Sequence, residues 1–370
     1  MALYLNTNAA FKDFQMLRND RYFVDKSAMI QKVNERVNTK NRFLCITKPR
    51  RFGKTSALNM LGAYYGKAYS SKELFDHLKI SRSQSYPVHM NQYNLISFSM
   101  NELSGQGNTY LDYIFSHELY QENQRDFLEF LRNLLKDRSY VALAYMTGVL
   151  PIKKYSTGSA LNMFDEYTML NDCCFDEYFG FTEQEAEMLC CRQSQLTLTE
   201  LAEWYNGYSA WDGRKLYNPR SVVLALINGI CRSYWTRTGK LDEVLFFLKY
   251  NLGEVRDDVI KMVNHMPVKI DISEEYAAGQ KSPSNREEIY AAMLVYGLLS
   301  YYDGELRIPN KELMLEFQKA LKDEEFGYVA ELVRNSNEML NATLEKREEA
   351  VAAYLHDIHN SKKAWSIFYW

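Results

Sequence analysis

The chain has 370 residues, of which 46% are hydrophobic and 25% charged, and its formal net charge is -3. These values are typical of a globular protein with two or three domains, and they exclude a global basic field that would draw the chain to nucleic acid or membranes. No apolar run is long enough to span a bilayer, and the N-terminus lacks a signal-peptide pattern. The six cysteines include no C-x-x-C pair and are expected to be reduced thiols. The sequence therefore predicts a cytoplasmic protein with no membrane partner.

The first predicted helix begins after Ser27 and continues through Val37, with Ser27 as its cap. The preceding Asp25 and Lys26 are expected to form a local ion pair or a cap. A contact between these two residues and a nucleotide is the alternative.

Residues 42–61 predict a buried strand, a basic turn and a helix. Phe43–Ile46 is a short apolar run, and apolar residues recur at helical spacing from Thr55 onward. The turn carries four cations within seven residues: Lys48, Arg50, Arg51 and Lys54. Cations at a helix N-terminus are repelled by the helix dipole, so an anion is expected there.

This arrangement predicts a phosphate-binding loop for ATP. Lys54 is expected to contact the β- and γ-phosphates, the Thr55 hydroxyl to hold Mg²⁺, and Gly53 to allow close approach of the backbone. Arg50 and Arg51 are expected to neutralise phosphate charge or to act on a neighbouring subunit's nucleotide. The residues predicted to bind the nucleotide are Lys48, Pro49, Arg50, Arg51, Phe52, Gly53, Lys54, Thr55 and Ser56. Lys48 replaces the first glycine of G-x-x-x-x-G-K-[ST], which leaves a solvated basic turn as the alternative.

Further strands and helices follow the loop. The pattern predicts strands over Tyr93–Met100, Tyr140–Thr147 and Tyr167–Leu170, the second of them central, and a helix over Asp126–Lys136. The succession predicts an α/β fold with a mostly parallel sheet of the P-loop NTPase type. Ligands of such sheets bind beyond the carboxyl ends of the strands. Thr147 lies at such an end, either as a sensor of the γ-phosphate or attacking water or as a turn cap.

The second half of the chain is predicted to be mainly helical. Thr182 and Glu185 form a capping box, and Pro219 suits the first turn of a helix. Helical periods cover Leu241–Lys249 and Glu287–Leu299, and Asp303-Gly304 predicts a hairpin. Helices followed by a hairpin indicate a winged-helix module, which we expect to be a lid because no dense basic helix precedes the hairpin.

The chain resembles a bacterial family with an AAA-ATPase-like domain, many members of which carry a PD-(D/E)XK nuclease domain behind it. The resemblance rests on motifs that keep the family's order over nearly the whole chain: Tyr22–Ser27, Lys48–Thr55, Thr147–Ile152, Trp204–Tyr208, Tyr217–Pro219 and Ile308–Asn310. The family's phosphate loop also reads P-R-R-F-G-K-T without the leading glycine. The resemblance implies binding of ATP and Mg²⁺ by a P-loop domain in which an extra strand lies between the phosphate-loop strand and its neighbour.

Two departures from the family stand out. The family has a strand ending in the acidic pattern I-D-E-[WY]-D, and its carboxylates hold Mg²⁺ and activate water. No apolar strand ends in Asp-Glu at that place here, and Glu102 is a weak substitute carboxylate. Leu355–His359 resembles the family's linker helix, but the nuclease domain does not follow.

The sequence thus predicts a P-loop domain at 1–235, a helical, winged-helix-like lid at 236–320 and a C-terminal helical segment at 321–370. The expected function is ATP binding with weak or no hydrolysis. The alternatives are a non-catalytic interaction protein on an ATPase scaffold and a DNA-binding regulator that uses the hairpin at 300–310. A homo-oligomer and a protein or nucleic-acid partner are compatible with these functions.

Overall fold

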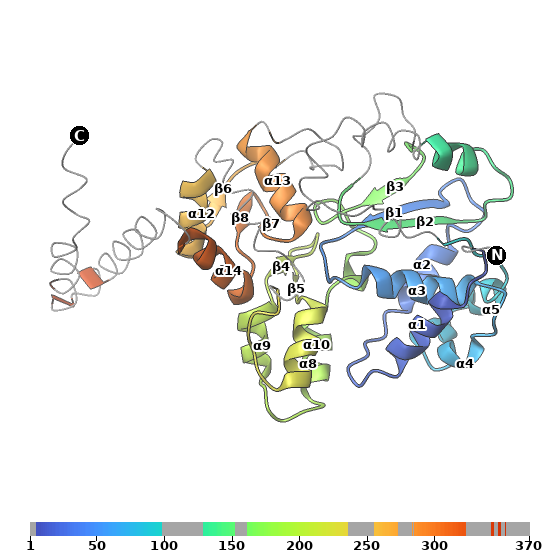
Figure 1. Ribbon diagram of the computed structural model, residues 1–370, viewed down its shortest axis with the longest axis horizontal. Coiled ribbons are helices and arrows are strands. Elements are labelled where there is room, and N and C mark those ends of the chain that lie inside the picture. The colour runs from blue at the N-terminus through green and yellow to red at the C-terminus, as the bar shows by residue number, and fades with distance from the viewer. Residues whose placement is uncertain are drawn as a thin grey trace, which may run out of the picture.

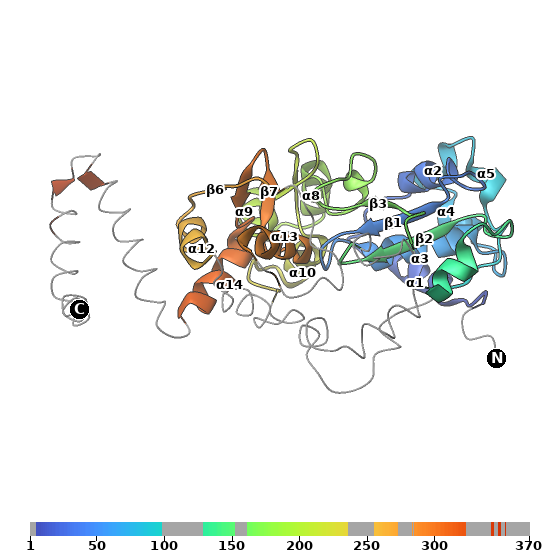
Figure 2. The same cartoon turned by 90° about the horizontal axis from the view of Figure 1, so that it is seen from above.

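The computed structural model describes residues 5–97, 129–151, 161–235, 255–272, 283 and 285–322, together with five residues between 342 and 352. Both overview pictures place the helix α12 (Val255–Val263) at one end of the described structure, far from its parallel sheet (Figures 1 and 2). The α/β class predicted from the sequence is confirmed at this level, because helices and a small parallel sheet are both present.

The parallel sheet has three strands among the described residues: β1 (Phe43–Thr47) lies between β2 (Ala144–Gly148) and β3 (Asp165–Tyr167). All five residues of β1 are buried. Leu44 and Ile46 belong to the largest hydrophobic cluster, whereas Phe43 and Cys45 belong to a separate cluster. The first four positions of the strand are therefore apolar because both of its faces are covered.

The predicted strands need three corrections. The strand expected at Tyr140–Thr147 begins at Ala144, since Tyr140 is 68% exposed, and among the described strands it flanks β1 instead of lying centrally. The last predicted strand lies at β3, two residues earlier than expected. In the described part of Tyr93–Met100, only isolated bridges form, and Ile96 is 53% exposed, so the alternation of residues does not mark a buried face.

Helices from the first hundred residues pack together on one side of the sheet in Figure 1. They are α1 (Ala9–Arg18), α2 (Ala28–Asn34), α3 (Lys54–Tyr65), α4 (Lys72–Phe75), a 3₁₀ turn (Lys79–Arg82) and α5 (Tyr86–His89). α1 lies so close to α3 that a Cβ on Gly62 would come 2.7 Å from Ala10 Cβ. α2 ends at Asn34, three residues before the predicted Val37. Ser27 does not cap it, because its hydroxyl accepts the Ile80 N–H instead.

A second helical group follows β3. Its elements are a 3₁₀ turn (Asp176–Tyr178), α8 (Glu183–Cys190), α9 (Leu198–Tyr205), β4 (Tyr208–Ser209), β5 (Lys215–Leu216) and α10 (Pro219–Asn228). The predicted capping box of Thr182 and Glu185 is confirmed at the start of α8. Pro219 occupies the first turn of α10 as predicted, and Asn218 caps that helix.

We call the last described elements the C-terminal module, which spans residues 255–272 and 285–322. It contains α12, β6 (Val268–Lys269), α13 (Arg286–Tyr296), β7 (Ser300–Tyr302), β8 (Glu305–Arg307) and α14 (Lys311–Lys322). Its strands form an antiparallel sheet in the order β6-β8-β7. The predicted hairpin is confirmed, with φ of 51° at Asp303 and 75° at Gly304, which suits a type I′ turn.

Several predicted features lie outside the described residues. These are the helical period at Leu241–Lys249, the carboxylate of Glu102 and most of the C-terminal segment at 321–370. Only residues 129–135 of the helix predicted at Asp126–Lys136 are described as helical. Within the described part of the chain, no helix has the length and apolarity that a bilayer crossing requires.

Candidate functional site

The turn between β1 and α3 opens at the N-terminus of α3. The Lys48 N–H donates to Gly148 O at 3.2 Å, which ties the start of the turn to the end of β2. Arg51 and Gly53 adopt positive φ values of 73° and 88°. A Cβ built on Gly53 would meet no atom within 4 Å, and no side chain caps the helix. The structure thus leaves room beside Gly53 and provides no side-chain cap for the first N–H groups of α3, as an anion-binding helix N-terminus requires.

Lys54 is the first residue of α3. Its ammonium donates to Lys48 O at 2.8 Å and to Pro49 O at 2.6 Å, both in the loop itself. Burial, and then the like charge of Arg50, lower the pKa of Lys54 to about 7. Thr55, the next residue, is exposed. A negatively charged ligand at this place would favour the charged form of Lys54.

Within the described part of the chain, the Lys48 side chain, unlike that of Lys54, forms a buried ion pair. Its ammonium lies 2.7 Å from Asp172 Oδ2 and donates to Thr168 O at 2.9 Å. The two side chains are 2% and 1% exposed. The other carboxylate oxygen, Asp172 Oδ1, accepts the backbone N–H groups of Cys174 and Phe175. The charge of Lys48 is thus neutralised inside the protein, and a phosphate contact by this residue stays a prediction.

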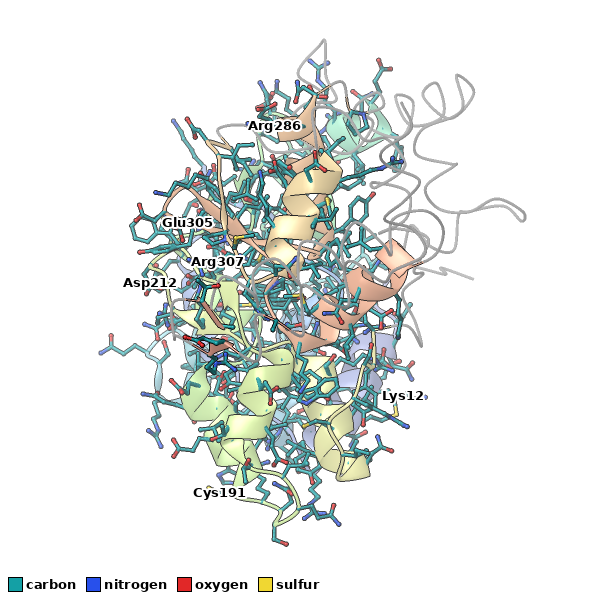
Figure 3. The ribbon with its side chains drawn as sticks, turned by 90° about the vertical axis from the view of Figure 1, so that its left-hand side faces the viewer. Lys12, Cys191, Asp212, Arg286, Glu305 and Arg307 are labelled. Carbon is teal, nitrogen blue, oxygen red and sulfur yellow. The ribbon has the colours of Figure 1, made fainter. Side chains whose placement is uncertain are left out.

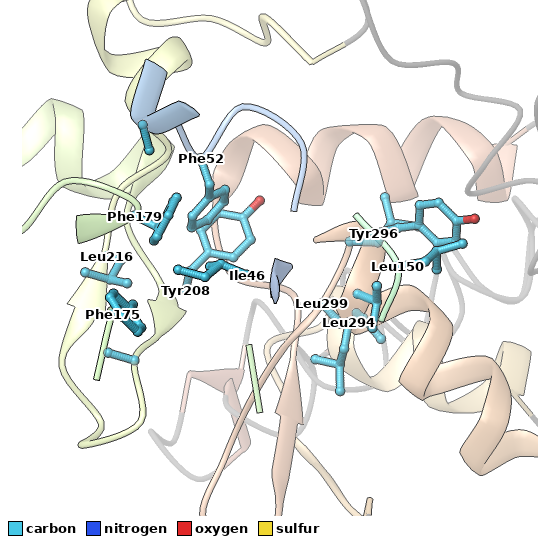
Figure 4. Close-up of a cluster of buried hydrophobic side chains, with 14 of the residues drawn as sticks. Ile46, Phe52, Leu150, Phe175, Phe179, Tyr208, Leu216, Leu294, Tyr296 and Leu299 are labelled. Atoms are coloured by element: carbon cyan, nitrogen blue, oxygen red, sulfur yellow. The ribbon is translucent and has the colours of Figure 1, made fainter. Parts of the chain in front are cut away.

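Arg51 and Phe52 also point into the protein. The Arg51 guanidinium donates to Tyr234 O at 3.0 Å and to Trp235 O at 2.6 Å, and it lies 5.0 Å from the centre of a Trp235 ring. Phe52 is 1% exposed, and its ring meets that of Tyr208 edge-on at 4.8 Å (Figure 4). The sequence places four cations at this helix end. The internal partners of Lys48 and Arg51 offset the positive charge of two of them.

Thr147 lies at the carboxyl end of β2, next to the phosphate loop strand. Its hydroxyl donates to Ile46 O at 2.8 Å, so the side chain links two neighbouring strands. A role for Thr147 as a sensor stays a prediction. Among the described residues, no group of three or more His, Cys, Asp or Glu side chains is arranged to hold a metal ion, which leaves the Thr55 hydroxyl as the predicted Mg²⁺ ligand.

The Tyr22–Ser27 motif has a structural explanation. Asp25 accepts the N–H groups of Ser27 at 2.8 Å and of Lys79 at 2.7 Å, which confirms the predicted cap. The predicted local ion pair is wrong, because Lys26 pairs with Glu185 at 2.7 Å. Burial lowers the pKa of Lys26 although Glu185 opposes that shift.

Three other motifs meet around Tyr208, whose ring contacts Phe52 of the loop between β1 and α3. A Cβ on Gly207 would come within 1.8 Å of Pro309 O, so the motifs at 204–208 and 308–310 touch through their backbones. The Tyr208 hydroxyl donates to Gly297 O at 3.0 Å, and the side chains of Asn218 and Asn310 lie beside it. Segments that are far apart in the sequence thus converge on one buried tyrosine.

Sequence reasoning missed the inner contacts of the loop. No sequence pattern points to Asp172, Trp235 or Glu312, although each fixes a loop cation directly or through the backbone. A lone carboxylate gives no local signal of its partner when the two residues are more than a hundred positions apart.

Comparisons with known proteins bear on the first part of the chain. Residues 9–125 match the model of the AAA-ATPase-like family, which is described as "Predicted AAA-ATPase". An "Uncharacterized protein in vnfD 5'region" of Azotobacter chroococcum mcd 1 is 32% identical over 117 residues, which are 31% of this chain and 22% of that protein. The chain thus matches about a fifth of that relative's length. No solved structure matches the chain.

The matched segment contains β1, the loop after it and α3, whereas the motifs from Thr147 onward lie beyond it. The resemblance to the AAA-ATPase-like family is therefore confirmed over residues 9–125.

Proposed function

We propose that this protein binds ATP at the loop between β1 and α3, and that it hydrolyses ATP weakly or not at all. The observation that carries the proposal is the open helix N-terminus beside Gly53, with the Lys54 ammonium held at its rim by two loop carbonyls. Backbone N–H groups, a lysine and a following threonine are the groups that a nucleotide phosphate and its metal require.

In this proposal, the phosphates are held by loop residues other than Lys48 and Arg51, whose side chains have internal partners. Gly53, Lys54, Thr55 and Ser56 surround the open helix end and are proposed to hold the phosphates, with Mg²⁺ on the Thr55 hydroxyl. Arg50 is proposed to add positive charge, since its charge already acts on Lys54. The bound Mg²⁺ would supply charge neutralisation for the phosphates.

Weak hydrolysis is proposed from the sequence departure at the acidic strand. The carboxylates that position the metal and water in related enzymes provide much of the catalysis available to phosphoryl transfer. We therefore expect binding without efficient turnover.

A nucleotide-dependent shift in thermal stability tests binding. Saturating Mg-ATP should stabilise the unaltered protein by about 2.7 kcal/mol at a hundredfold excess over Kd. Lys54→Ala should lose this stabilisation. Lys12→Ala is the matched control, because Lys12 is an exposed lysine on α1, which packs against α3 (Figure 3). An unaltered melting temperature in the natural protein would refute ATP binding.

A phosphate-release assay tests hydrolysis separately. We expect turnover far below the roughly 10 s⁻¹ typical of enzymes, in both the natural protein and Lys54→Ala. Turnover near that rate, lost in Lys54→Ala, would show an active ATPase and would also exclude the non-catalytic scaffold.

DNA binding through the β7–β8 hairpin has less support. Arg307 pairs with Glu305 on the same strand, and the labelled side chains lie close together in Figure 3. Lys311 lies 2.6 Å from Glu203 and 4.9 Å from the Trp204 ring centre. Both cations already have carboxylate partners, which reduces the charge that they offer to phosphates. Retention of the protein on duplex DNA at low salt, lost when Arg307 and Lys311 are both neutralised, would instead support DNA binding through the hairpin.

A further inference from the structure

The loop between β1 and α3 is contacted by residues that lie beyond the matched segment at 9–125. Pro49 contacts the end of α13, because a Cβ on Gly297 would come within 2.5 Å of Pro49 Cβ. The Phe52 carbonyl accepts the Gly180 N–H at 3.3 Å. Arg51 binds the carbonyls of Tyr234 and Trp235. Three contacts of the loop, at Pro49, Arg51 and Phe52, therefore depend on residues after position 179.

The peptide groups that hold Arg51 are themselves held by α14. The Tyr234 N–H donates to Glu312 Oε1 at 2.6 Å, and Ser221 donates its hydroxyl to Glu312 Oε2 at 2.8 Å. Glu312 is 1% exposed and lies in the first turn of α14. The chain of contacts thus runs from the loop to the C-terminal module through one short backbone segment.

This series of contacts has a carboxylate, that of Glu312, at one end and a guanidinium, that of Arg51, at the other. Tyr234 directs its N–H toward the Glu312 carboxylate and its carbonyl toward the Arg51 guanidinium. The dipole of the intervening backbone is therefore aligned between a negative and a positive charge, and hydrogen bonds in such a series strengthen one another. Arg51 is also a non-glycine residue at φ +73°, a conformation that persists only where surrounding contacts impose it.

We propose that Arg51 and Glu312 are positioning residues that couple the phosphate loop to the C-terminal module, so that nucleotide affinity depends on the docking of that module. The proposal rests on the ATP-binding function proposed above. In it, Glu312 holds the 234–235 backbone, that backbone holds Arg51, and Arg51 fixes the loop conformation that presents the helix end to phosphates. Neither side chain touches the nucleotide.

The chain offers a matched control one helical turn away. Glu316 is also on α14 and also 1% exposed, but its carboxylate accepts from Ser233 Oγ at 2.7 Å and from Lys319 Nζ at 3.1 Å. Glu312→Gln and Glu316→Gln therefore change carboxylates of equal burial on the same helix. The Kd of a fluorescent ATP analogue is the measurement, and circular-dichroism melts show that each variant is folded.

We expect Glu312→Gln to raise Kd about tenfold, whereas Glu316→Gln should change it by less than about twofold. Arg51→Lys keeps the charge but loses the planar guanidinium that donates to two carbonyls, so it should also raise Kd about tenfold. It therefore tests the coupling even if Glu312→Gln fails to fold. Combining Arg51→Lys with Glu312→Gln should add little to either change alone, because both break one chain of contacts.

Two results would overturn the coupling. A Glu312→Gln variant that is folded and binds the ATP analogue as tightly as the natural protein would show that Glu312 does not hold the loop in its binding conformation. Fully additive effects of Arg51→Lys and Glu312→Gln would show that the residues act independently. If the natural protein does not bind the ATP analogue, both the ATP-binding proposal and the coupling fail. If the natural protein binds it but the variants do not behave as expected, only the coupling fails.

Discussion

Lys48 and Asp172 form an ion pair in which the Nζ–Oδ2 distance is 2.7 Å and neither side chain is more than 2% exposed. Lys48 stands where phosphate loops of the common pattern have their first glycine. The pair explains how a lysine is accommodated there, since its charge is turned away from the helix end and matched behind it.

Removal of one member of this pair is expected to be costly. Asp172→Asn should destabilise the protein by about 3–5 kcal/mol, because it leaves the Lys48 charge buried without compensation. Urea denaturation measures this, with Asp165→Asn as the control. Asp165 pairs with Arg36 but its side chain is 49% exposed, so its loss should cost less than about 1 kcal/mol.

The double variant Lys48→Met with Asp172→Asn separates the charge from the other hydrogen bonds of Asp172. It should be more stable than Asp172→Asn alone, because it removes the unpaired charge while the Asn side-chain oxygen can still accept the N–H groups of Cys174 and Phe175. Equal costs for Asp172→Asn and Asp165→Asn would contradict the importance of the buried pair.

The lowered pKa of Lys54 predicts a pH-dependent cost in the ligand-free protein. Its folded pKa of about 7 lies below the ordinary value of 10.5, so the unfolded chain binds the proton more strongly. The stability lost by charging Lys54 is complete below pH 7 and is regained as the pH rises from about 7 toward 10.5. Lys54→Met should therefore unfold at a higher temperature than the natural protein at pH 7.

The difference between the two melting temperatures should shrink at pH 9. The comparison of each protein with itself at both pH values removes effects of other titrating groups, because these are common to both chains. A Lys54→Met variant that is less stable than the natural protein at pH 7 would show that the two loop carbonyls outweigh the burial of the charge.

The close approach of Gly207 to Pro309 predicts a strong effect of a single methyl group. Gly207→Ala would place a Cβ 1.8 Å from a backbone oxygen at φ +122°, and should cost about 3 kcal/mol or more. Gly304→Ala is the control, because its φ is +75° but no atom lies within 4 Å of the added Cβ. It should cost only about 1–2 kcal/mol in denaturant unfolding. Similar values for both variants would mean that the backbone contact relaxes easily.

Trp235 should report on the phosphate loop through its contact with Arg51. Nucleotide binding that shifts Arg51 would change the electrostatic environment of an indole ring 5.0 Å away. We expect ATP to change the intrinsic fluorescence of the protein, and Trp235→Phe to abolish that change. Trp211→Phe should retain it, because Trp211 is 60% exposed and belongs to a different loop. A signal that survives in Trp235→Phe would exclude this ring as the reporter.

The sequence predicts the local parts of this structure well. β1, the start of α3, the capping box at Thr182 and the hairpin at Asp303 each depend on residues within a few positions of one another. Their signals are local hydrogen bonding and hydrophobic period, which any reader of the chain can detect.

The orientation of the loop side chains was not predictable in the same way. Lys48, Arg51 and Lys54 are equivalent as cations in a short basic stretch, yet only Lys54 lies at the open helix end. The difference comes from partners at Asp172 and Trp235, whose positions depend on tertiary packing. The strand predicted at Tyr93–Met100 fails for a related reason, because alternation of residue types does not show which face the fold will bury.

The position of β1 in the sheet has a consequence for synthesis of the chain. Both hydrogen-bonding edges of β1 pair with strands that follow residue 125, and the Thr147–Ile46 contact spans 101 residues. A ribosome releases β1 long before it releases either partner. At about 5–20 residues per second, this mostly apolar strand waits several seconds without its neighbours. The expressed fragment 9–125 would keep that condition permanently, so we expect it to aggregate even though it contains the whole phosphate loop.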